Sequence, residues 1–323
     1  MTGRAAEPLA CSTVPDRSLT RAFRPAGPFD LRRSILVLRR GPYDPAFRAG
    51  RDGVVWRATR TPAGPATLRL AQARDGAEPR VTADAWGPGA AWALERLPAL
   101  LGAEDEPGAF VPHHPLIAES LRRNPGVRLI RTGLVMESLI PSVLEQRVTT
   151  EEAYRAWRLL LRWYGEPAPG PGAAAGMYVM PEPRTFALIP SWEWHRAGVD
   201  PKRSAAVVRA ARVARRMEEA AAMALPEAMA RLTAVPGIGP WTAAETLQRA
   251  NGDPDALTVG DLHLPRTVGY ALGGERDADD DRMLQLLAPY AGQRHRAARL
   301  VLLTGIAPPR RAPRQRHARI ARL

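Results

Sequence analysis

The hydrophobic positions divide the chain into two parts with different periodicity. Between positions 34 and 83 the apolar residues occur in short, alternating or β-branched runs separated by Gly, Pro and Asp, a pattern typical of short strands. From about position 115 they recur at helical spacing. The pattern predicts an α+β fold, in which a small N-terminal antiparallel-sheet domain precedes an all-α domain.

The individual elements follow from these runs and from their flanking turn residues. Strands are predicted at residues 34–38, 53–59, 66–71 and 80–83, and a helix over 87–101 should pack on their sheet. The helices predicted further along the chain are 115–123, 134–147, 150–164, 183–188, 201–224, 227–234, 240–250, 262–272, 279–287 and 294–304. Residues 167–177, rich in Pro, Gly and Ala, are expected to form a loop.

Changes in composition mark the domain boundaries. Residues 1–28 have little periodicity and are expected to form a flexible basic arm. An α+β domain should cover 29–108 and end in an acidic, turn-rich linker. A helical domain should cover 109–307, and a basic tail should follow at 308–323.

Charge narrows the class of partner. The chain has 323 residues, a formal net charge of +13 and a sequence pI near 11.1, which indicates a polyanionic partner. Lys202 is the single lysine, so arginine carries nearly all of the positive charge.

Cys11 is the single cysteine, which excludes an intrachain disulfide and a four-cysteine iron–sulfur cluster. No long apolar run or signal-peptide pattern is present, so we expect a cytoplasmic, nucleoid-associated protein with no membrane contact.

The most specific segment lies at residues 232–244, with the sequence LTAVPGIGPWTAA. Pro236 should end one helix, and Pro240 suits the first position of the next. Gly237 and Gly239 permit positive φ and a close approach of the backbone, so amides there can point at a phosphate. Ile238 should turn inward and hold the helices together. The alternative is an ordinary helical hairpin whose glycines only make the turn.

A carboxylate follows the hairpin at Asp261, directly before an apolar helix. An aspartate at such a place commonly caps the helix. It can also stabilise the positive charge that develops on a sugar during N-glycosidic cleavage, and orient the attacking water. Both roles are compatible with one residue. Asp253 and Asp255 lie in a polar Gly/Pro loop and are expected to be solvated turn residues.

These segments resemble the helix-hairpin-helix (HhH-GPD) superfamily of base-excision DNA glycosylases, and within it the bacterial DNA-3-methyladenine glycosylase II family. The likeness runs from about residue 29 to 307 and is carried by VLEQRVT at 143–149 and PGIGPWTA at 236–243. It implies a TATA-binding-protein-like first domain, a phosphate-binding hairpin made of Pro236, Gly237, Ile238, Gly239 and Thr242, and Asp261 as the catalytic carboxylate.

The resemblance also implies the reaction. Superfamily members that cut the strand use a lysine just after the hairpin, and Trp241 stands at that position. We therefore expect a monofunctional enzyme that flips out and excises 3-methyladenine-type purines from double-stranded DNA. We also expect it to be a monomer. The alternatives are a non-catalytic DNA-binding protein that keeps the fold, and a glycosylase with attached lyase activity, which Trp241 opposes.

The expected base pocket departs from the family. Glu245 stands where the family has a tyrosine, and Gln293 where it has a tryptophan, so the aromatic cage is incomplete. Trp241 either lines the pocket or packs between helices. Trp192 and Trp194 are further candidates for a ring, although burial in the core is expected for at least one. Gln146 and Arg147 match the place of the side chain that fills the gap in the duplex, although a surface role suits an arginine equally.

Metal chemistry has little support in the sequence. Six histidines and one cysteine, without ligand spacing, argue against a zinc site. His263, two residues after Asp261, is a candidate for the site, and packing or a phosphate contact suits it equally. No cofactor is expected, apart from a structural monovalent cation on the backbone carbonyls of Val235 and Ile238, which only the family resemblance implies.

Overall fold

The computed structural model describes residues 18–75 and 78–309. Cys11, most of the predicted basic arm and nearly all of the basic tail lie outside these ranges. Within them, no helix is long and apolar enough to cross a membrane.

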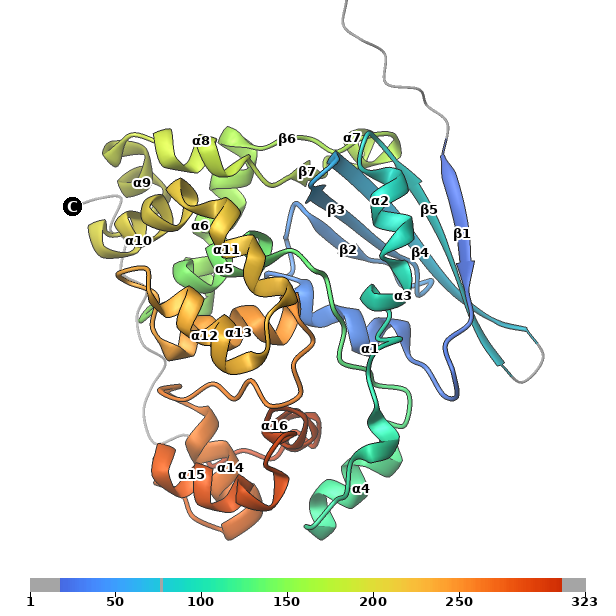
Figure 1. Cartoon of the computed structure of the whole chain (residues 1–323), viewed down its shortest axis with the longest axis vertical. Coiled ribbons are helices and arrows are strands. Elements are labelled where there is room, and N and C mark those ends of the chain that lie inside the picture. Colours follow the sequence, from blue (N-terminus) through green and yellow to red (C-terminus); the bar gives the residue numbers. More distant parts are fainter. Residues whose placement is uncertain (1–17, 76–77, 310–323) are drawn as a thin grey trace, which may run out of the picture.

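The N-terminal part is a five-stranded antiparallel sheet (Figure 1). Its strands are, in spatial order, β1 (Leu19–Phe23), β5 (Glu78–Trp86), β4 (Gly64–Asp75), β3 (Val55–Thr61) and β2 (Phe47–Ala49). Alternate residues of the central strands, such as Leu68 and Leu70, are buried on one face. Three short helices contribute to the same apolar cluster: α1 (Leu31–Ile35), α2 (Ala90–Glu95) and α3 (Leu97–Leu100). The predicted α+β order is confirmed.

Two predictions for this part were wrong. Residues 34–38 are not a strand, because Leu31–Ile35 is a helix and Leu36–Leu38 a 3-10 turn. The Asp30 carboxylate accepts from the Arg33 N–H at 2.9 Å and caps the helix. A short apolar run does not distinguish a strand from a buried helix.

The second error concerns the arm predicted at 1–28, since β1 lies inside it. Leu19 pairs with Ala85 and Phe23 with Val81. The strand is mostly exposed, so it has no buried face to create an alternating pattern. The three-residue strand β2 was not predicted either, and the predicted helix 87–101 is divided at Arg96 into α2 and α3.

The rest of the chain is helical, as predicted. The helices are α4 (Pro115–Arg123), α5 (Val135–Leu144), α6 (Thr150–Tyr164), α7 (Pro171–Ala174), α8 (Pro183–Leu188), α9 (Ser191–Ala197), α10 (Pro201–Arg212), α11 (Ala214–Glu218), α12 (Leu225–Thr233), α13 (Pro240–Ala250), α14 (Leu264–Gly273), α15 (Asp280–Leu287) and α16 (Arg294–Leu303). The helix predicted over 201–224 ends at Arg212, and α11 and a 3-10 turn follow. The short α7 and α9 were not predicted, and α7 falls in the segment expected to be a loop.

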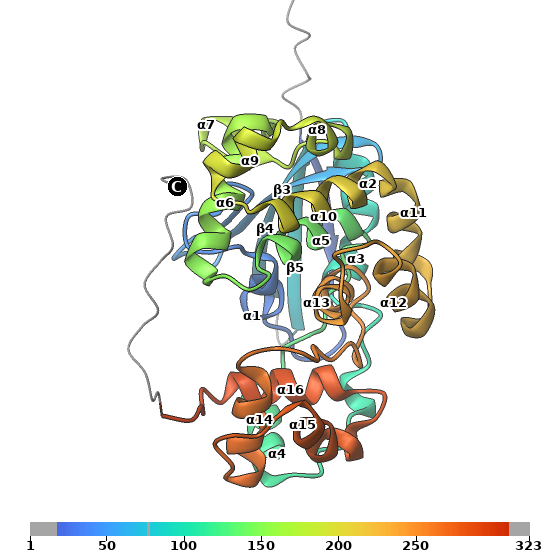
Figure 2. The same cartoon turned by 90° about the vertical axis from the view of Figure 1, so that its left-hand side faces the viewer.

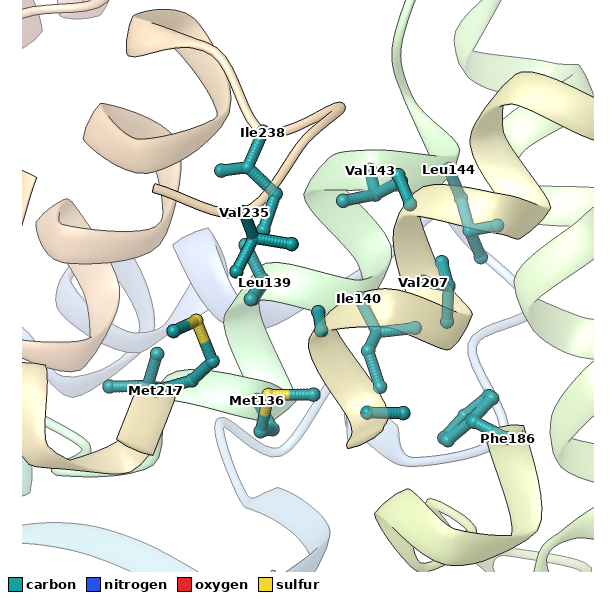
Figure 3. Packing of buried hydrophobic residues seen from close by; sticks show 14 of the residues in the cluster. Met136, Leu139, Ile140, Val143, Leu144, Phe186, Val207, Met217, Val235 and Ile238 are labelled. Atoms are coloured by element: carbon teal, nitrogen blue, oxygen red, sulfur yellow. The ribbon is translucent and has the colours of Figure 1, made fainter. Parts of the chain in front are cut away.

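Two apolar clusters organise the helices. The larger is built around α5, whose residues are nearly all buried. Figure 3 shows that Leu139 and Val143 lie on the side of α5 that faces Val235 and Ile238. The smaller cluster joins α4 to α14, α15 and α16 and forms the lower end of the molecule in Figures 1 and 2. The segment between α13 and α14, which contains Asp261, connects the two.

A buried carboxyl, Asp44, lies where the sheet meets the helical part. Its oxygens accept from the N–H groups of Arg40 and Ala46 at 2.7 and 3.0 Å, and from the Trp157 indole at 3.1 Å. Burial raises the pKa of Asp44 from 3.8 to about 6, against the lowering effect of these donors.

This pKa predicts a pH effect on stability. A carboxyl whose pKa is higher in the folded state stabilises the fold fully below its unfolded pKa, and that contribution is lost as the pH rises through the folded pKa. The free energy of unfolding should therefore fall by about 3 kcal/mol between roughly pH 4 and 7 on account of this group. Urea titrations of native protein and Asp44→Asn test it, because the variant should lack this part of the decline. Equal pH dependence in both proteins would refute the assignment.

Candidate active site at the helix hairpin

The turn between α12 and α13 has the geometry expected of a phosphate-binding hairpin. The Ile238 N–H donates to the Val235 carbonyl at 3.0 Å. Both side chains are buried in the large cluster, as predicted for Ile238. Gly237 has φ +97°, and a Cβ there would lie 2.7 Å from Cβ of Ala206, so glycine is required. Gly239 differs from the prediction, because its φ is −92° and needs no glycine.

The hairpin leaves backbone donors exposed. Among the described residues, the N–H groups of Gly237 and Gly239 donate to no acceptor. A Cβ on Gly239 would meet no atom within 4 Å, so the space before it is open. The free amides at the start of α13 add a partial positive charge. The arrangement can bind an anion.

Gln146 supports the hairpin from the segment that follows α5. Its Nε2 donates to the Gly237 carbonyl at 3.0 Å and to Thr242 Oγ1 at 2.7 Å. Thr242 is only 2% exposed, and its part in the phosphate-binding hairpin stays an untested prediction. The Thr242 hydroxyl accepts the hydrogen bond from Gln146 on the buried side of the turn and so stabilises the turn. In the structure Gln146 stabilises the turn through these two hydrogen bonds. The sequence suggested instead that it fills the gap left in the duplex by the flipped nucleotide.

Arg147 stands beside Gln146 with an unusual backbone. It is exposed and has φ +54°, which within the described ranges makes it the single non-glycine residue of positive φ. Such a conformation costs free energy in a residue with a Cβ, and it often marks functional sites. The guanidinium forms no ion pair with any described residue. This geometry favours a side chain that projects from the loop over one lying on a helix surface.

Asp261 is held rigidly by donors on both of its carboxylate oxygens. Oδ1 accepts from the N–H groups of His263 and Leu264, each at 2.7 Å, which ties the carboxylate to the start of α14. Oδ2 accepts from the Trp241 indole Nε1 at 2.9 Å. The N-cap residue of α14 is His263, so Asp261 does not occupy the predicted cap position, but its carboxylate binds the N–H groups of the N-cap residue and of the first helical residue. The bond to Trp241 was not predicted, because it joins two helices through a tertiary contact.

Trp241 consequently connects the hairpin to the carboxylate. It occupies the second position of α13, so the helix that presents free amides also orients Asp261. The lysine that a lyase step would require is absent from this position. Lys202 is exposed on α10, as predicted.

Glu245, expected at the base pocket, is an ion-paired residue. Its carboxylate lies 2.7 Å from Nη1 of Arg249, one helical turn further along α13, and both side chains are about 15% exposed. Arg249 also donates through Nε to the Val37 carbonyl at 2.9 Å. The negative charge of Glu245 is therefore already compensated within the protein.

Removing Glu245 should be costly, since it would leave the Arg249 cation without its partner. We expect Glu245→Ala to lower the free energy of unfolding by about 3 kcal/mol. Glu119→Ala provides a matched control, because Glu119 pairs with the largely exposed Arg122 and Arg123 on α4 and should cost less than about 1 kcal/mol. Equal losses in urea denaturation would contradict the burial argument.

None of the other ring and pocket candidates forms a hydrogen bond with Asp261 among the described residues. Gln293 precedes α16, accepts from Arg296 Nε at 2.6 Å and lines a cavity of about 180 Å³ together with Asn251. Trp194 is 2% exposed and stacks near Phe186 at 6.3 Å, as expected for a core residue. Trp192 is exposed on α9, which Figures 1 and 2 place at the opposite end of the molecule from α14.

The prediction that Asp255 is solvated was wrong. Its carboxylate is 15% exposed and accepts from the backbone N–H and from Nε of Arg294, at 2.9 and 2.8 Å. Asp253 in turn accepts from the Asp255 N–H at 2.8 Å. The loop before Asp261 is thus fixed to α16, and the partner lies too far along the sequence for a local pattern to indicate it.

The hairpin carbonyls expected to bind a monovalent cation are those of Val235 and Ile238. Val235, Pro236 and Gly237 accept from Ile238 N, Arg209 Nη1 and Gln146 Nε2, respectively. The Arg209 guanidinium also brings positive charge to this edge. The Ile238 carbonyl accepts from no donor among the described residues, and a cation at Val235 and Ile238 stays an untested prediction. Within the described ranges, no group of three or more His, Cys, Asp or Glu could hold a metal ion.

Comparison with solved structures defines the fold. MBOgg1 in complex with a low-affinity DNA ligand superposes with a TM-score of 0.70 at 14% identity, over 91% of this chain and 97% of that one. The 3-methyladenine DNA glycosylase of Archaeoglobus fulgidus superposes with a TM-score of 0.68 at 17% identity, over 88% and 97%. The apo 8-oxoguanine glycosylase/lyase of Clostridium acetobutylicum gives 0.65 at 12% identity, over 85% and 92%. The chain therefore has the fold of the helix-hairpin-helix DNA glycosylases, as the sequence resemblance indicated.

Comparison with curated protein sequences finds a more specific similarity. The chain is 29% identical over 241 residues to the probable bifunctional transcriptional activator/DNA repair enzyme AlkA of Mycobacterium tuberculosis, in two strains. The alignment covers 71% of this chain and 46% of the relative, so the chain spans about half the length of the curated relatives that it matches. No protein-family model matches the chain.

Proposed function

We propose that this protein is a monofunctional DNA N-glycosylase that hydrolyses the glycosidic bond of alkylated purines in duplex DNA. The observation that carries the proposal is the Asp261 carboxylate, fixed between the Trp241 indole and the start of α14 beside an anion-binding hairpin. The fold shared with DNA glycosylases and the likeness to a DNA repair enzyme support it.

The chemistry follows from this arrangement. Departure of the base leaves positive charge on the deoxyribose, and a preorganised carboxylate stabilises that charge without reorienting during the reaction. Asp261 also accepts a proton or hydrogen bond from the attacking water. Because three donors already hold the carboxylate, its direction is set before substrate binds.

DNA binding positions the sugar over Asp261. One phosphate lies on the amides of Gly237 and Gly239, and the damaged nucleotide turns out of the duplex. Arg147, exposed on its left-handed backbone, fills the gap. The protein acts as a monomer on damaged duplexes.

Alkylated purines are the proposed substrate class, because the Archaeoglobus neighbour is described as a 3-methyladenine glycosylase and the curated relative as a DNA repair enzyme AlkA. Chromatography of free bases released from methylated duplex DNA tests this, with hypoxanthine and 8-oxoguanine duplexes in parallel. Release of methylpurines is expected. Release of 8-oxoguanine without release of methylpurines would instead indicate that oxidised bases are the substrate class.

A further inference from the structure

The chain enters Asp261 through a glycine that is bound by a residue of another helix. Gly260 is exposed and has φ +85°, and a Cβ there would meet no atom within 4 Å. Its N–H donates to both carboxylate oxygens of Asp280, at 3.1 Å to Oδ1 and 3.0 Å to Oδ2. Asp280 lies in the first turn of α15, and the sequence did not single it out. A contact from α15 therefore reaches the backbone one residue before Asp261.

This contact holds a part of the loop that its own packing leaves free. Glycine is the most permissive residue, and the open space around Gly260 means that steric contacts do not fix its backbone. Trp241 and the N–H groups at the start of α14 hold the Asp261 side chain. Asp280 holds instead the backbone that carries this side chain. An N–H donated to an ionised carboxylate is charge-assisted and stronger than a neutral hydrogen bond.

Asp280 acts from a rigid element. Met283 and Leu287, on the same helix, are fully buried in the apolar cluster that α15 shares with α14 and α16. Helix α15 lies beside α14 in both views (Figures 1 and 2). A Cβ on Gly269 of α14 would lie 2.2 Å from the Cβ of Ala278, just before α15. This close approach fixes the start of α15, and with it Asp280, relative to α14.

Asp280 is the middle one of three consecutive aspartates at 279–281. Asp279 accepts from the Arg282 N–H at 2.9 Å and caps α15. Asp281 is exposed on the helix. Among the described residues, only Asp280 accepts from the Gly260 N–H. The contact therefore depends on one side chain and not on the general acidity of the helix start.

We propose that Asp280 is a positioning residue for the reaction, which holds the Gly260 N–H and thereby fixes the place of Asp261 relative to the sugar. The inference rests on the proposed function, because it gives Asp261 the catalytic step. Asp280 acts through Gly260 and needs no contact with DNA. A displacement of about 1 Å at a reacting centre can cost roughly 100-fold in rate. Loss of this anchor should therefore slow base release without weakening DNA binding.

The test compares the rate of the chemical step with DNA affinity. Under saturating full-length enzyme, Asp280→Ala should slow single-turnover release of methylpurines about 10-fold. Its affinity for a fluorescent duplex with one tetrahydrofuran abasic site should stay within about twofold of the native value. Asp280→Asn keeps an acceptor for the Gly260 N–H without the charge, and should retain at least about half of the native rate.

The neighbouring aspartates provide matched controls. Asp281→Ala removes the same charge one position further on and should leave the release rate within about twofold of native. Asp279→Ala removes the cap of α15 and should lower the urea midpoint of unfolding but not the release rate. A native rate in Asp280→Ala would overturn the proposal. So would equal slowing in Asp280→Asn, or in Asp281→Ala, since either would assign the effect to charge.

Hydrogen exchange detects the contact without any reaction. Mass spectrometry of peptides that span residues 257–264 should show faster deuterium uptake in Asp280→Ala than in the native protein, and native uptake in Asp281→Ala. Equal uptake in native protein and Asp280→Ala would show that Asp280 does not hold the loop, and would reject its positioning role. A native protein that releases no base from methylated duplexes would instead contradict the proposed function, so the two failures are distinguishable.

Discussion

Replacing Asp261 with asparagine should slow base release by roughly 100- to 1,000-fold, the range observed when one electrostatic contact to a transition state is removed. Asparagine can still accept through Oδ1 from the N–H groups of His263 and Leu264, so the start of α14 is preserved, whereas its Nδ2 cannot accept from the Trp241 indole and that bond is lost. The variant lacks the negative charge that stabilises the sugar cation. Single-turnover release of methylpurines under saturating enzyme measures the chemical step directly.

The control for Asp261→Asn is DNA binding. Its affinity for the abasic duplex should lie within a few fold of the native value, and its thermal unfolding should be cooperative. A variant that binds normally and releases bases at the native rate would show that Asp261 only holds the start of α14. A variant that loses binding would indicate that the substitution disturbed the loop that joins Asp261 to Trp241.

Substituting Gly237 with alanine should damage both the fold and the interface. The added Cβ would lie 2.7 Å from the Ala206 Cβ, and φ +97° is strained for any residue with a side chain. We expect a loss of about 2 kcal/mol in the free energy of unfolding, because the turn must move away from α10. Affinity for DNA should fall by at least about tenfold as the amides are displaced.

Gly239→Ala is the matched control for Gly237→Ala. At Gly239 the backbone is compatible with alanine, and the new Cβ meets no protein atom within 4 Å. Stability, measured by urea denaturation, should therefore stay within about 0.5 kcal/mol of the native value. Affinity for DNA should nevertheless fall, because the Cβ enters the space in which a phosphate approaches the amides. Equal stability of the two variants would contradict the packing of Gly237 on α10.

The sequence predicted the parts of the site that depend on local chemistry. A proline and two glycines between apolar helices are enough to indicate the hairpin, and an aspartate before the next helix indicates Asp261. The hydrogen bond from Trp241 to Asp261 and the bracing of Thr242 by Gln146 could not be predicted in the same way. Each joins segments that only the tertiary fold brings together.

The same distinction explains the errors in the fold. Central strands β3, β4 and β5 were found because their alternate residues enter one buried face. The strand β1 was missed because an exposed edge strand has no such face. The segment after Asp30 was misassigned because a run of branched apolar residues suits both states. Long-range ion pairs, such as Asp255 with Arg294, leave no local signal at all.

The central claim is that the hairpin and Asp261 together hydrolyse a glycosidic bond in duplex DNA without cutting the strand. The most direct measurement uses a labelled duplex methylated at one known purine, incubated with native protein and analysed with and without alkali. The account predicts that free methylpurine is released into solution and that the strand breaks only after treatment with alkali. A strand that stays intact after alkali, although the protein has bound it, would contradict the account and favour a DNA-binding protein that keeps the fold without the activity.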